Sequence, residues 1–360
     1  MARLRDFAAR ATRPILVLAG AGVVAYLFYQ VGPRVVWTSV RPLGWRLPIV
    51  LFFPAAAAVV LDTFGWRVLL PGHHIPLGVL LRARLAGEAV NLTTPTASVG
   101  GEPLKAYLLR PYVPLIEGLV SVVVDKTTVV AGQALLLGAG LVLAASVLPV
   151  RSPLMLAMEG LLVVEIVAVS GFVLVQTLGV FGGGGRVLGR MGMGPAARYQ
   201  EGLNALDREL RRFYRERRGR LLGSVLLHGA AWATGGLEIY LVLAFLGLAP
   251  SLITALVIEA FGAAVKFASF MIPASLGALE GGHVAIFGAL GLGGAMGLSY
   301  TLIRRLREAV WVALGVLWLA SLRARPWLGE PEALDEAADA PRGSAPPPAE
   351  GGGTSEPSLC

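Results

Sequence analysis

Long apolar runs separated by short polar and basic segments fill most of this sequence. A helix that crosses a membrane needs about 20 predominantly apolar residues. Six runs approach or exceed that length, at residues 15–31, 47–70, 115–148, 154–180, 221–246 and 296–322. The first run lacks a clear small-residue cleavage site, which favours an uncleaved span over a secretory signal. The pattern predicts an all-α integral membrane protein with about six transmembrane helices.

Two further stretches, at about 79–109 and 251–290, are too polar for a simple lipid-exposed span. Pro95 and the pair Gly100–Gly101 break the first of them. Its polar side chains are Arg82, Arg84, Glu88, Asn91, Glu102 and Lys105. Non-helical backbone at membrane depth is tolerated only where protein or a wet cavity covers it. We therefore expect a re-entrant helical hairpin, with one helix to about residue 91 and a second from about residue 103.

The broken segment occurs twice. PTASVGGE at 95–102 and PASLGALE at 273–280 both place a glutamate seven residues after a proline. The residues of the two segments that favour tight turns and close helix approach are Pro95, Gly100, Gly101, Pro273 and Gly277. The coincidence predicts an internal repeat, with halves at about 47–148 and 221–322.

The spacing around the two glutamates also repeats. A basic residue follows each glutamate by 24 positions, Lys126 after Glu102 and Arg304 after Glu280. Three full spans, an odd number, separate the two expected hairpins. The first hairpin would then open to the cytoplasm and the second to the outside. Such an inverted repeat is typical of secondary transporters.

Composition agrees with a polytopic membrane protein and argues against nucleic-acid binding. The chain is 55% hydrophobic and 15% charged, with a mean hydropathy of +0.69. Its net charge of +8 comes from basic residues clustered at the ends of apolar runs, as in membrane-flanking segments. These positions place both termini in the cytoplasm. We expect the protein to lie in the inner, cytoplasmic membrane of a bacterium.

Two segments outside the expected spans differ in character. Residues 186–220 carry ten arginines against four acids, and their apolar residues recur at helical spacing: Leu203, Leu206, Leu210 and Phe213. This pattern indicates a basic amphipathic cytoplasmic helix, either docked on anionic headgroups or simply exposed. Residues 326–360 have no core-forming pattern, so we expect the membrane domain to occupy 1–325 and a disordered cytoplasmic tail to follow.

The intramembrane charges are the candidate functional residues. We expect Glu102 and Glu280 to face a shared polar cleft near the bilayer midplane, because ionisable groups there are costly and usually functional. The proposed substrate-binding set is Glu102, Glu280, Lys105, Lys126, Arg304, Arg305, Asp125 and Asn91. Its basic members suit a lipid phosphate. The alternative is that both glutamates are internal ion-pair partners that lock the hairpins.

Sequence signals for catalysis are weak. The four histidines (His73, His74, His228 and His283) lack metal-ligand spacing. No Walker, Rossmann or nucleophile-elbow motif is present. The one cysteine, Cys360, provides no disulfide framework. We therefore expect no enzymatic activity, no metal site and no cofactor.

Three motifs resemble a known family. NLTTPTASVGGEPLKAYLLR, VVVDKTTVVAG, and IPASLGALEGG with the later YTLIRRLREAVWVALG are similar to the flippase-like membrane domain of lysylphosphatidylglycerol synthases and its stand-alone relatives. The resemblance covers about residues 10–325, and a hopanoid-associated branch of that family is similar in size. It implies motif roles for Gly101, Glu102, Asp125, Pro273, Gly277, Glu280 and Arg305. The tail leaves no room for the synthases' soluble transferase, so we do not expect aminoacyl transfer.

Together these observations predict a lipid translocase or a lipid-transport accessory protein. Its partners would be an anionic phospholipid or another amphipathic lipid, and possibly lipid-biosynthesis proteins. Two alternatives stay open. One is a membrane-embedded enzyme that modifies lipid headgroups, and the other is a non-transporting scaffold for a lipid, such as hopanoid, synthesis complex.

Overall fold

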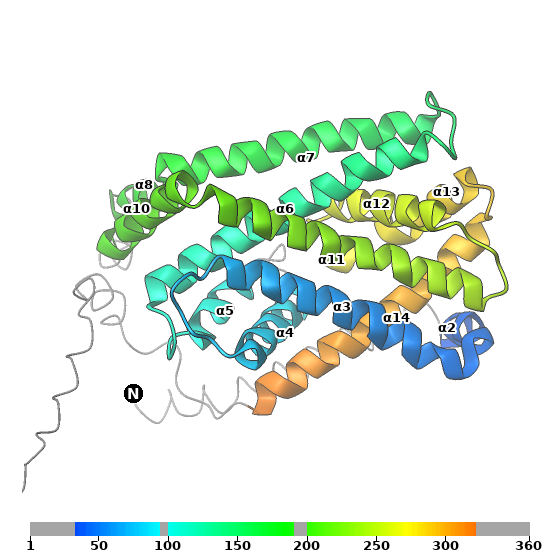
Figure 1. Ribbon diagram of the computed structural model, residues 1–360, viewed down its shortest axis with the longest axis horizontal. Helices are drawn as coiled ribbons and strands as arrows, with labels where there is room; N and C mark the ends of the chain where they lie inside the picture. The colour runs from blue at the N-terminus through cyan, green and yellow to red at the C-terminus, as the bar shows by residue number, and fades with distance from the viewer. Residues whose placement is uncertain (1–32, 94–99, 191–199, 322–360) are drawn as a thin grey trace, which may run out of the picture.

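The computed structural model describes residues 33–93, 100–190 and 200–321 (Figure 1). The expected span at 15–31, Pro95 and the tail at 326–360 lie outside the described residues. Regular structure in the described ranges is helical, as expected. The helices, with η for 3₁₀-helices, are α2 (Pro33–Val40), η1 (Arg41–Arg46), α3 (Leu47–Val68), α4 (Leu77–Thr93), α5 (Glu102–Leu108), α6 (Leu115–Ala144), α7 (Pro153–Leu178), α8 (Val180–Arg190), α10 (Gln200–Glu216), α11 (Arg218–Phe245), α12 (Leu252–Ala268), η2 (Pro273–Ser275), α13 (Ala278–Ala289) and α14 (Gly294–Ser321).

Four described helical segments are long and apolar enough to cross a membrane. They are Trp37–Val68, Leu115–Ala144, Pro153–Leu178 and Arg218–Phe245. Each corresponds to one of the six expected spans. The expected span at 296–322 is the long helix α14, but its four charged residues, Arg304, Arg305, Arg307 and Glu308, set it apart from the other four. The protein is a multi-pass, all-α membrane protein.

The two broken segments form helix pairs that lie toward opposite ends of the bundle. Helices α3, α6, α7 and α11 run along the longest dimension of the molecule, and α14 crosses the bundle beside α4 (Figure 1). The α4–α5 pair lies at the end that also carries α8 and α10. The α12–α13 pair lies toward the other end, which also carries α2.

Each helix pair packs on its own apolar core. Trp66, Leu80 and Leu109 are buried where α3, α4 and α5 meet. Phe261 and Phe287 are buried where α12, α13 and α14 meet, and Phe287 stacks on Tyr300 with ring centroids 5.8 Å apart. Burial of this apolar surface fixes each pair against the long helices.

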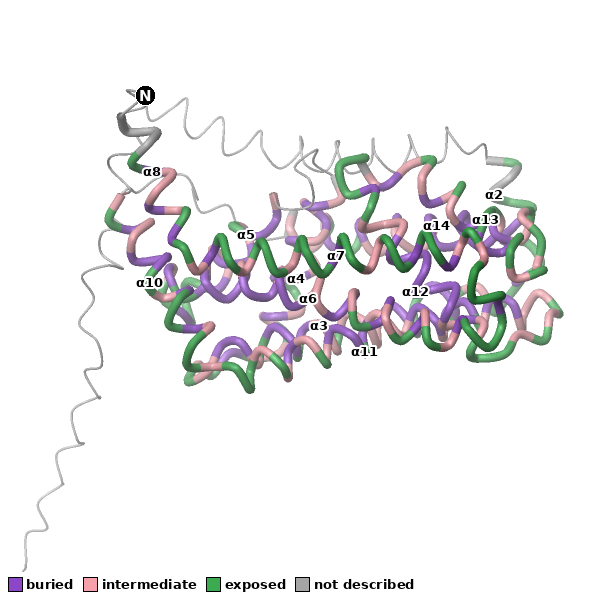
Figure 2. The backbone as a smooth tube through the Cα atoms, turned by 90° about the horizontal axis from the view of Figure 1, so that it is seen from above, coloured by how far each residue is buried: buried purple, intermediate pink, exposed green. Residues whose placement is uncertain are grey.

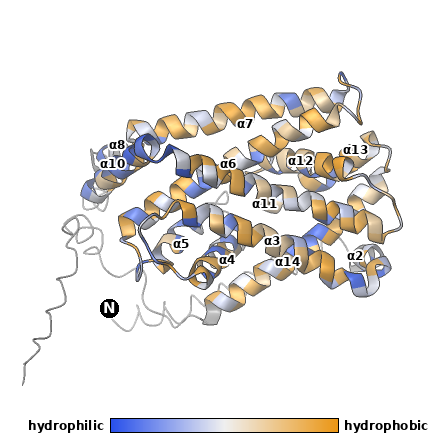
Figure 3. Ribbon diagram, viewed as in Figure 1, coloured by the Kyte–Doolittle hydropathy of each residue, from blue (hydrophilic) through white to orange (hydrophobic). Residues whose placement is uncertain are grey.

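Helix α7 forms an outer edge of the bundle. Its long outward face is exposed (Figure 2) and mostly apolar (Figure 3), as the exposure of Val163, Val164, Ile166 and Val167 indicates. Within an 18-residue apolar stretch of this helix, only 11% is buried inside the protein. An apolar face of this size suits contact with lipid tails.

The apolar face of α10 packs against the bundle. Leu206, Leu210 and Phe213 are buried in a cluster with Val120 and Val124 of α6. The sequence had left open that this face docks on lipid headgroups, but α6 already covers it. Tyr214 adds polar contacts, because its hydroxyl donates to Gln176 Oε1 at 3.0 Å. Burial raises the pKa of Tyr214, which keeps this donor protonated.

Four consecutive glycines at 182–185 predict a flexible break after the preceding span, but this prediction is wrong, because the structure places them in helix α8. The chain turns at Gly179 instead, where φ is +84°. Asp207 of α10 explains the difference. Its carboxylate accepts hydrogen bonds from the backbone N–H groups of Phe181 (3.3 Å) and Gly182 (2.7 Å) in the first turn of α8. A carboxylate at a helix N-terminus satisfies free donors and the helix dipole.

Candidate functional site

Asn91 joins the two helices of the first pair. Its Oδ1 accepts a hydrogen bond from the Gly101 backbone N–H at 2.7 Å, and its Nδ2 donates to Glu102 Oε1 at 3.1 Å. Gly101 lies against Gly87 of α4 so closely that any side chain at Gly101 would overlap the Gly87 carbonyl. The absence of side chains at both positions thus lets α4 and α5 touch.

Glu102 lies in a buried network of cations at the start of α5. Lys105 Nζ lies 3.2 Å from the Glu102 carboxylate and 2.8 Å from Glu88 Oε1. Lys126 Nζ approaches Glu102 Oε1 from α6 at 3.6 Å. The Glu102 and Lys105 side chains are 7% and 1% exposed, whereas Lys126 is 29% and Glu88 43% exposed. The network therefore has a buried centre and two partly exposed members.

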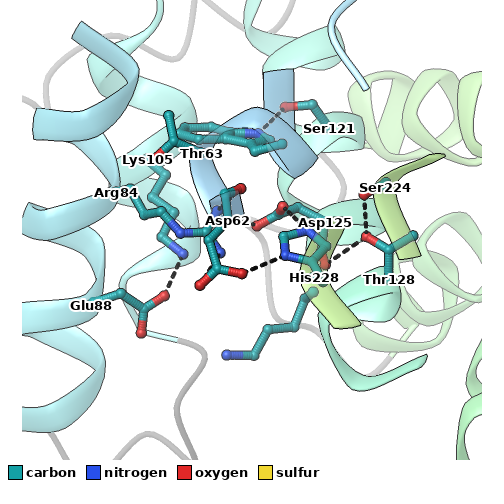
Figure 4. Close-up of polar contacts among 12 residues, drawn as sticks. Asp62, Thr63, Arg84, Glu88, Lys105, Ser121, Asp125, Thr128, Ser224 and His228 are labelled. Carbon is teal, nitrogen blue, oxygen red and sulfur yellow. Dashed lines mark hydrogen bonds and ion pairs between the residues drawn. The ribbon is translucent and has the colours of Figure 1, made fainter. Parts of the chain in front are cut away.

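A second group of charges lies next to this network, where α3, α4, α6 and α11 meet (Figure 4). His228 Nδ1 lies 2.6 Å from Asp62 Oδ1, and His228 Nε2 lies 3.0 Å from Asp125 Oδ1. Arg84 lies 3.4 Å from Asp125 Oδ2 and 3.8 Å from Asp62 Oδ2. One imidazole and one guanidinium therefore bridge the same two carboxylates.

In the second helix pair, Arg305 of α14 holds the turn. Its guanidinium donates to Glu280 Oε1 (2.9 Å) and to the backbone carbonyls of Ala274 (2.7 Å) and Ser275 (3.3 Å). Ala274 and Ser275 have φ angles of +51° and +52°, a region that side chains disfavour. Glu280 Oε2 also accepts from the Gly277 backbone N–H at 2.7 Å, at the start of α13.

Arg304 of α14 makes a buried, two-point ion pair with Glu259 of α12. Its two terminal nitrogens contact Glu259 Oε2 at 2.6 Å and Oε1 at 3.1 Å, and one of them also contacts the Tyr300 hydroxyl at 3.0 Å. A bidentate arginine–carboxylate pair is geometrically specific as well as strong. It fixes α14 against α12.

The remaining charges near the second pair are also matched. Glu308 of α14 contacts Arg305 Nη1 at 3.0 Å and Lys266 Nζ at 3.4 Å. Arg307 pairs with the buried Glu238 of α11. The Lys266 side chain is 36% exposed. As at the first pair, one lysine is partly exposed at the edge of a buried network.

The predicted site residues divide into two sets. Asn91, Glu102, Lys105 and Lys126 join one network, with Asp125 beside it, and Glu280, Arg304 and Arg305 belong to the other. Within the described ranges, no ion pair links the two sets. Each predicted glutamate has charged partners of its own within its set, a feature of the alternative in which the glutamates lock the hairpins.

The contacts differ between the two segments that the sequence analysis predicted to be a repeat. Lys126 pairs with Glu102, but the residue that pairs with Glu280 is Arg305 and not Arg304. Asn91 bridges two helices, whereas the Ser269 hydroxyl donates to the Val265 carbonyl in its own helix. Equivalent positions in the sequence thus carry different interactions.

Sequence reasoning missed Asp62, Arg84, His228 and Glu259 as members of buried clusters. A signal for two of them was present, because Asp62 and His228 are ionisable residues inside apolar spans, and such residues usually have a function. Their partnership was not accessible, since they lie 166 residues apart. Asp125 and Lys126, adjacent in sequence, have separate partners, as the helical geometry requires.

Comparison with known proteins adds two findings. Residues 14–316 match the family described as the lysylphosphatidylglycerol synthase TM region. A UPF0104 membrane protein of Methanothermobacter thermautotrophicus is 32% identical over 103 residues, which are 27% of this chain and 30% of that protein. The match therefore spans less than a third of that relative's length. No solved structure matches the chain.

Proposed function

This chain belongs to the lysylphosphatidylglycerol synthase TM region family, and from that premise we propose that it is a translocase, or a transport accessory, for an anionic or other amphipathic lipid. It would act in the inner membrane of a bacterium. We propose a transport role and no chemistry of its own, without a metal or cofactor. A lipid-biosynthesis protein, for example of a hopanoid pathway, is the partner class that would supply the lipid.

One observation carries the proposal: beside each helix pair, a partly exposed lysine lies at the edge of a buried ion network. Lys126 is held by Glu102 at 3.6 Å, and Lys266 is held by Glu308 at 3.4 Å. These contacts are longer than the 2.6 Å between Arg304 and Glu259. A lipid phosphate can compete for such a loosely held, partly solvated ammonium group, whereas the buried arginine pairs keep the fold intact.

Apolar side chains beside Lys266 support the same role. Phe270, Met271 and Ile272, in the turn after α12, are 54%, 70% and 43% exposed. A cation next to exposed apolar side chains matches the chemistry of an anionic lipid, with its headgroup at the lysine and its acyl chains along the turn.

The placement of the helix pairs supports alternating exposure to the two leaflets. We propose that both pairs are re-entrant hairpins of an inverted repeat, the first open to the cytoplasm and the second to the outside. In transporters built this way, movement of one repeat against the other exposes a central site to each side in turn. The basic helix α10 and both termini would lie in the cytoplasm.

Reconstituted vesicles provide the test. Purified full-length protein is placed in vesicles that contain fluorescent phosphatidylglycerol, and leaflet exchange is measured as loss of protected fluorescence after an impermeant quencher is added. We expect wild type to exchange the lipid, and Lys126→Gln and Lys266→Gln to do so about tenfold more slowly, which corresponds to about 1.4 kcal/mol of lost interaction.

Arg212→Gln is the matched control. Arg212 is a 51% exposed cation in an ion pair with Glu216 on α10, outside both networks. Its removal should leave exchange unchanged. A monodisperse wild-type protein that exchanges no labelled lipid would refute the translocase proposal and favour the scaffold. Lysine variants as fast as wild type would refute the headgroup role.

A further inference from the structure

We propose that His228 is a proton-binding site that couples lipid movement to the proton gradient. This inference rests on the proposed function and identifies its energy source. The site consists of His228 between Asp62 and Asp125, with Arg84 behind both carboxylates. These residues come from α11, α3, α6 and α4, so the site joins four helices.

The imidazole contacts fit a histidine that carries two protons. Nδ1 lies 2.6 Å from an Asp62 oxygen and Nε2 lies 3.0 Å from an Asp125 oxygen. Both oxygens can only accept when the carboxylates are ionised. A neutral imidazole has one donor and would present a lone pair to the other carboxylate, whereas a protonated imidazole donates to both.

The surrounding helices are shaped to admit this ring. A Cβ added to Gly65 of α3 would lie 2.8 Å from the His228 ring, and one added to Gly132 of α6 would lie 2.9 Å from the His228 Cβ. Atoms at these separations would clash. Two glycines on two helices thus leave the space that His228 occupies.

The charges around the site balance only when His228 is protonated. Around the site, the fixed cations are Arg84, Lys105 and Lys126, and the carboxylates are Asp62, Asp125, Glu88 and Glu102. With neutral His228 this set has one excess negative charge, and with protonated His228 it is balanced. An uncompensated charge inside a membrane protein is costly.

At the second helix pair, the positive and negative side chains are equal in number without a protonated histidine. Its four cations, Lys266, Arg304, Arg305 and Arg307, match its four carboxylates, Glu238, Glu259, Glu280 and Glu308. His283 lies nearby, but among the described residues its side chain is hydrogen-bonded to the Thr301 hydroxyl, at 3.0 Å, and not to a carboxylate. Only in the first set does the histidine decide the net charge.

Asp62 is the most exposed member of the site, so we place proton entry there. Its side chain is 26% exposed, whereas those of His228, Asp125 and Arg84 are 0%, 2% and 5% exposed. A proton taken up at the Asp62 carboxylate passes to His228 Nδ1 across 2.6 Å and returns by the same atoms when the site faces the other side. Proton loss removes one donor from the contacts among α3, α6 and α11, which favours their rearrangement.

A measurement without lipid tests the site itself. The full chain is labelled with ¹⁵N-histidine in detergent micelles, and the His228 signals are assigned from His228→Gln. Between about pH 9 and about pH 5 the His228 ring should change from one bound proton to two. Asp62→Asn should shift the midpoint of this transition, and His283→Gln should not. A ring with a single protonation state over that range, or a midpoint unaffected by Asp62→Asn, would overturn the proposal.

Vesicles with a pH difference of about one unit test the coupling. If one proton moves with each lipid, wild type should redistribute the labelled lipid about tenfold between leaflets. His228→Gln should leave it evenly distributed, and His283→Gln should behave as wild type. Wild-type exchange that ignores the gradient would overturn the coupling but keep the translocase. Absence of exchange in any condition would refute the translocase, and the histidine titration would then decide the proton site alone.

Discussion

At the scale of single residues, removing one partner of a buried ion pair should strongly destabilise the protein. Glu259 and Arg304 are 1% and 4% exposed and form two short contacts. Glu259→Gln would leave a buried guanidinium without a counter-charge, so we expect a loss of about 3–5 kcal/mol of stability. Thermal unfolding in detergent measures the effect.

The control for this prediction is a matching pair on the surface. Glu216→Gln removes the partner of Arg212, but both side chains are more than half exposed. Such pairs contribute about 0–1 kcal/mol. Equal melting temperatures for the two variants would contradict the importance assigned to the Glu259–Arg304 pair.

Close helix contacts make a second residue-scale prediction. A Cβ at Gly132 would lie 2.7 Å from the Gly229 backbone nitrogen of α11, so Gly132→Ala should destabilise the protein by about 1–3 kcal/mol. Gly138, on the same helix, has only a Leu162 methyl at 3.9 Å, and Gly138→Ala should stabilise the protein by up to about 1 kcal/mol, because alanine is the better helix former. Chemical unfolding of both variants separates a contact effect from a helix-propensity effect, and equal stabilities would refute the contact.

At the scale of elements, α10 is held by its apolar face. Leu210 is fully buried against α6, so Leu210→Ala should weaken that contact by about 2–5 kcal/mol and free α10 from the bundle. Trypsin should then cleave at the arginines of α10 several-fold faster. Leu226→Ala, at a 53% exposed position on α11, is the control. Unchanged cleavage in the Leu210 variant would show that other contacts hold α10.

Sequence reasoning predicted helices better than helix contacts. The helix breaks followed from proline and glycine, so α4 ends at Thr93 and α5 begins at Glu102, each within two residues of expectation. The helical glycine run of α8 was missed, because its stability comes from Asp207 of another helix. Asp62 and His228 were missed as partners for the same reason. Local pattern determines where a helix lies, whereas helix packing determines which side chains meet.

At the scale of the whole molecule, the orientation in the membrane can be measured. Cys360 is replaced by Ser, and single cysteines are placed at Arg212 on α10 or at Val150, a 60% exposed residue in the loop before α7. The cells are kept intact except that their outer membrane is permeabilised. A maleimide that cannot cross the inner membrane should then label the Val150→Cys protein. It should label the Arg212→Cys protein only after the inner membrane is lysed. The reverse pattern would invert the proposed topology.

The turn of the second helix pair has an energetic consequence. Ala274 and Ser275 both adopt left-handed backbone angles, each at a cost of order 1–3 kcal/mol. Their carbonyls are held by one guanidinium, that of Arg305. The turn therefore has an unfavourable backbone conformation, which it would leave if the hydrogen bonds from Arg305 were lost. Any movement of α14 that withdraws Arg305 removes these contacts from the turn, so the position of α14 and the backbone conformation of the turn are coupled.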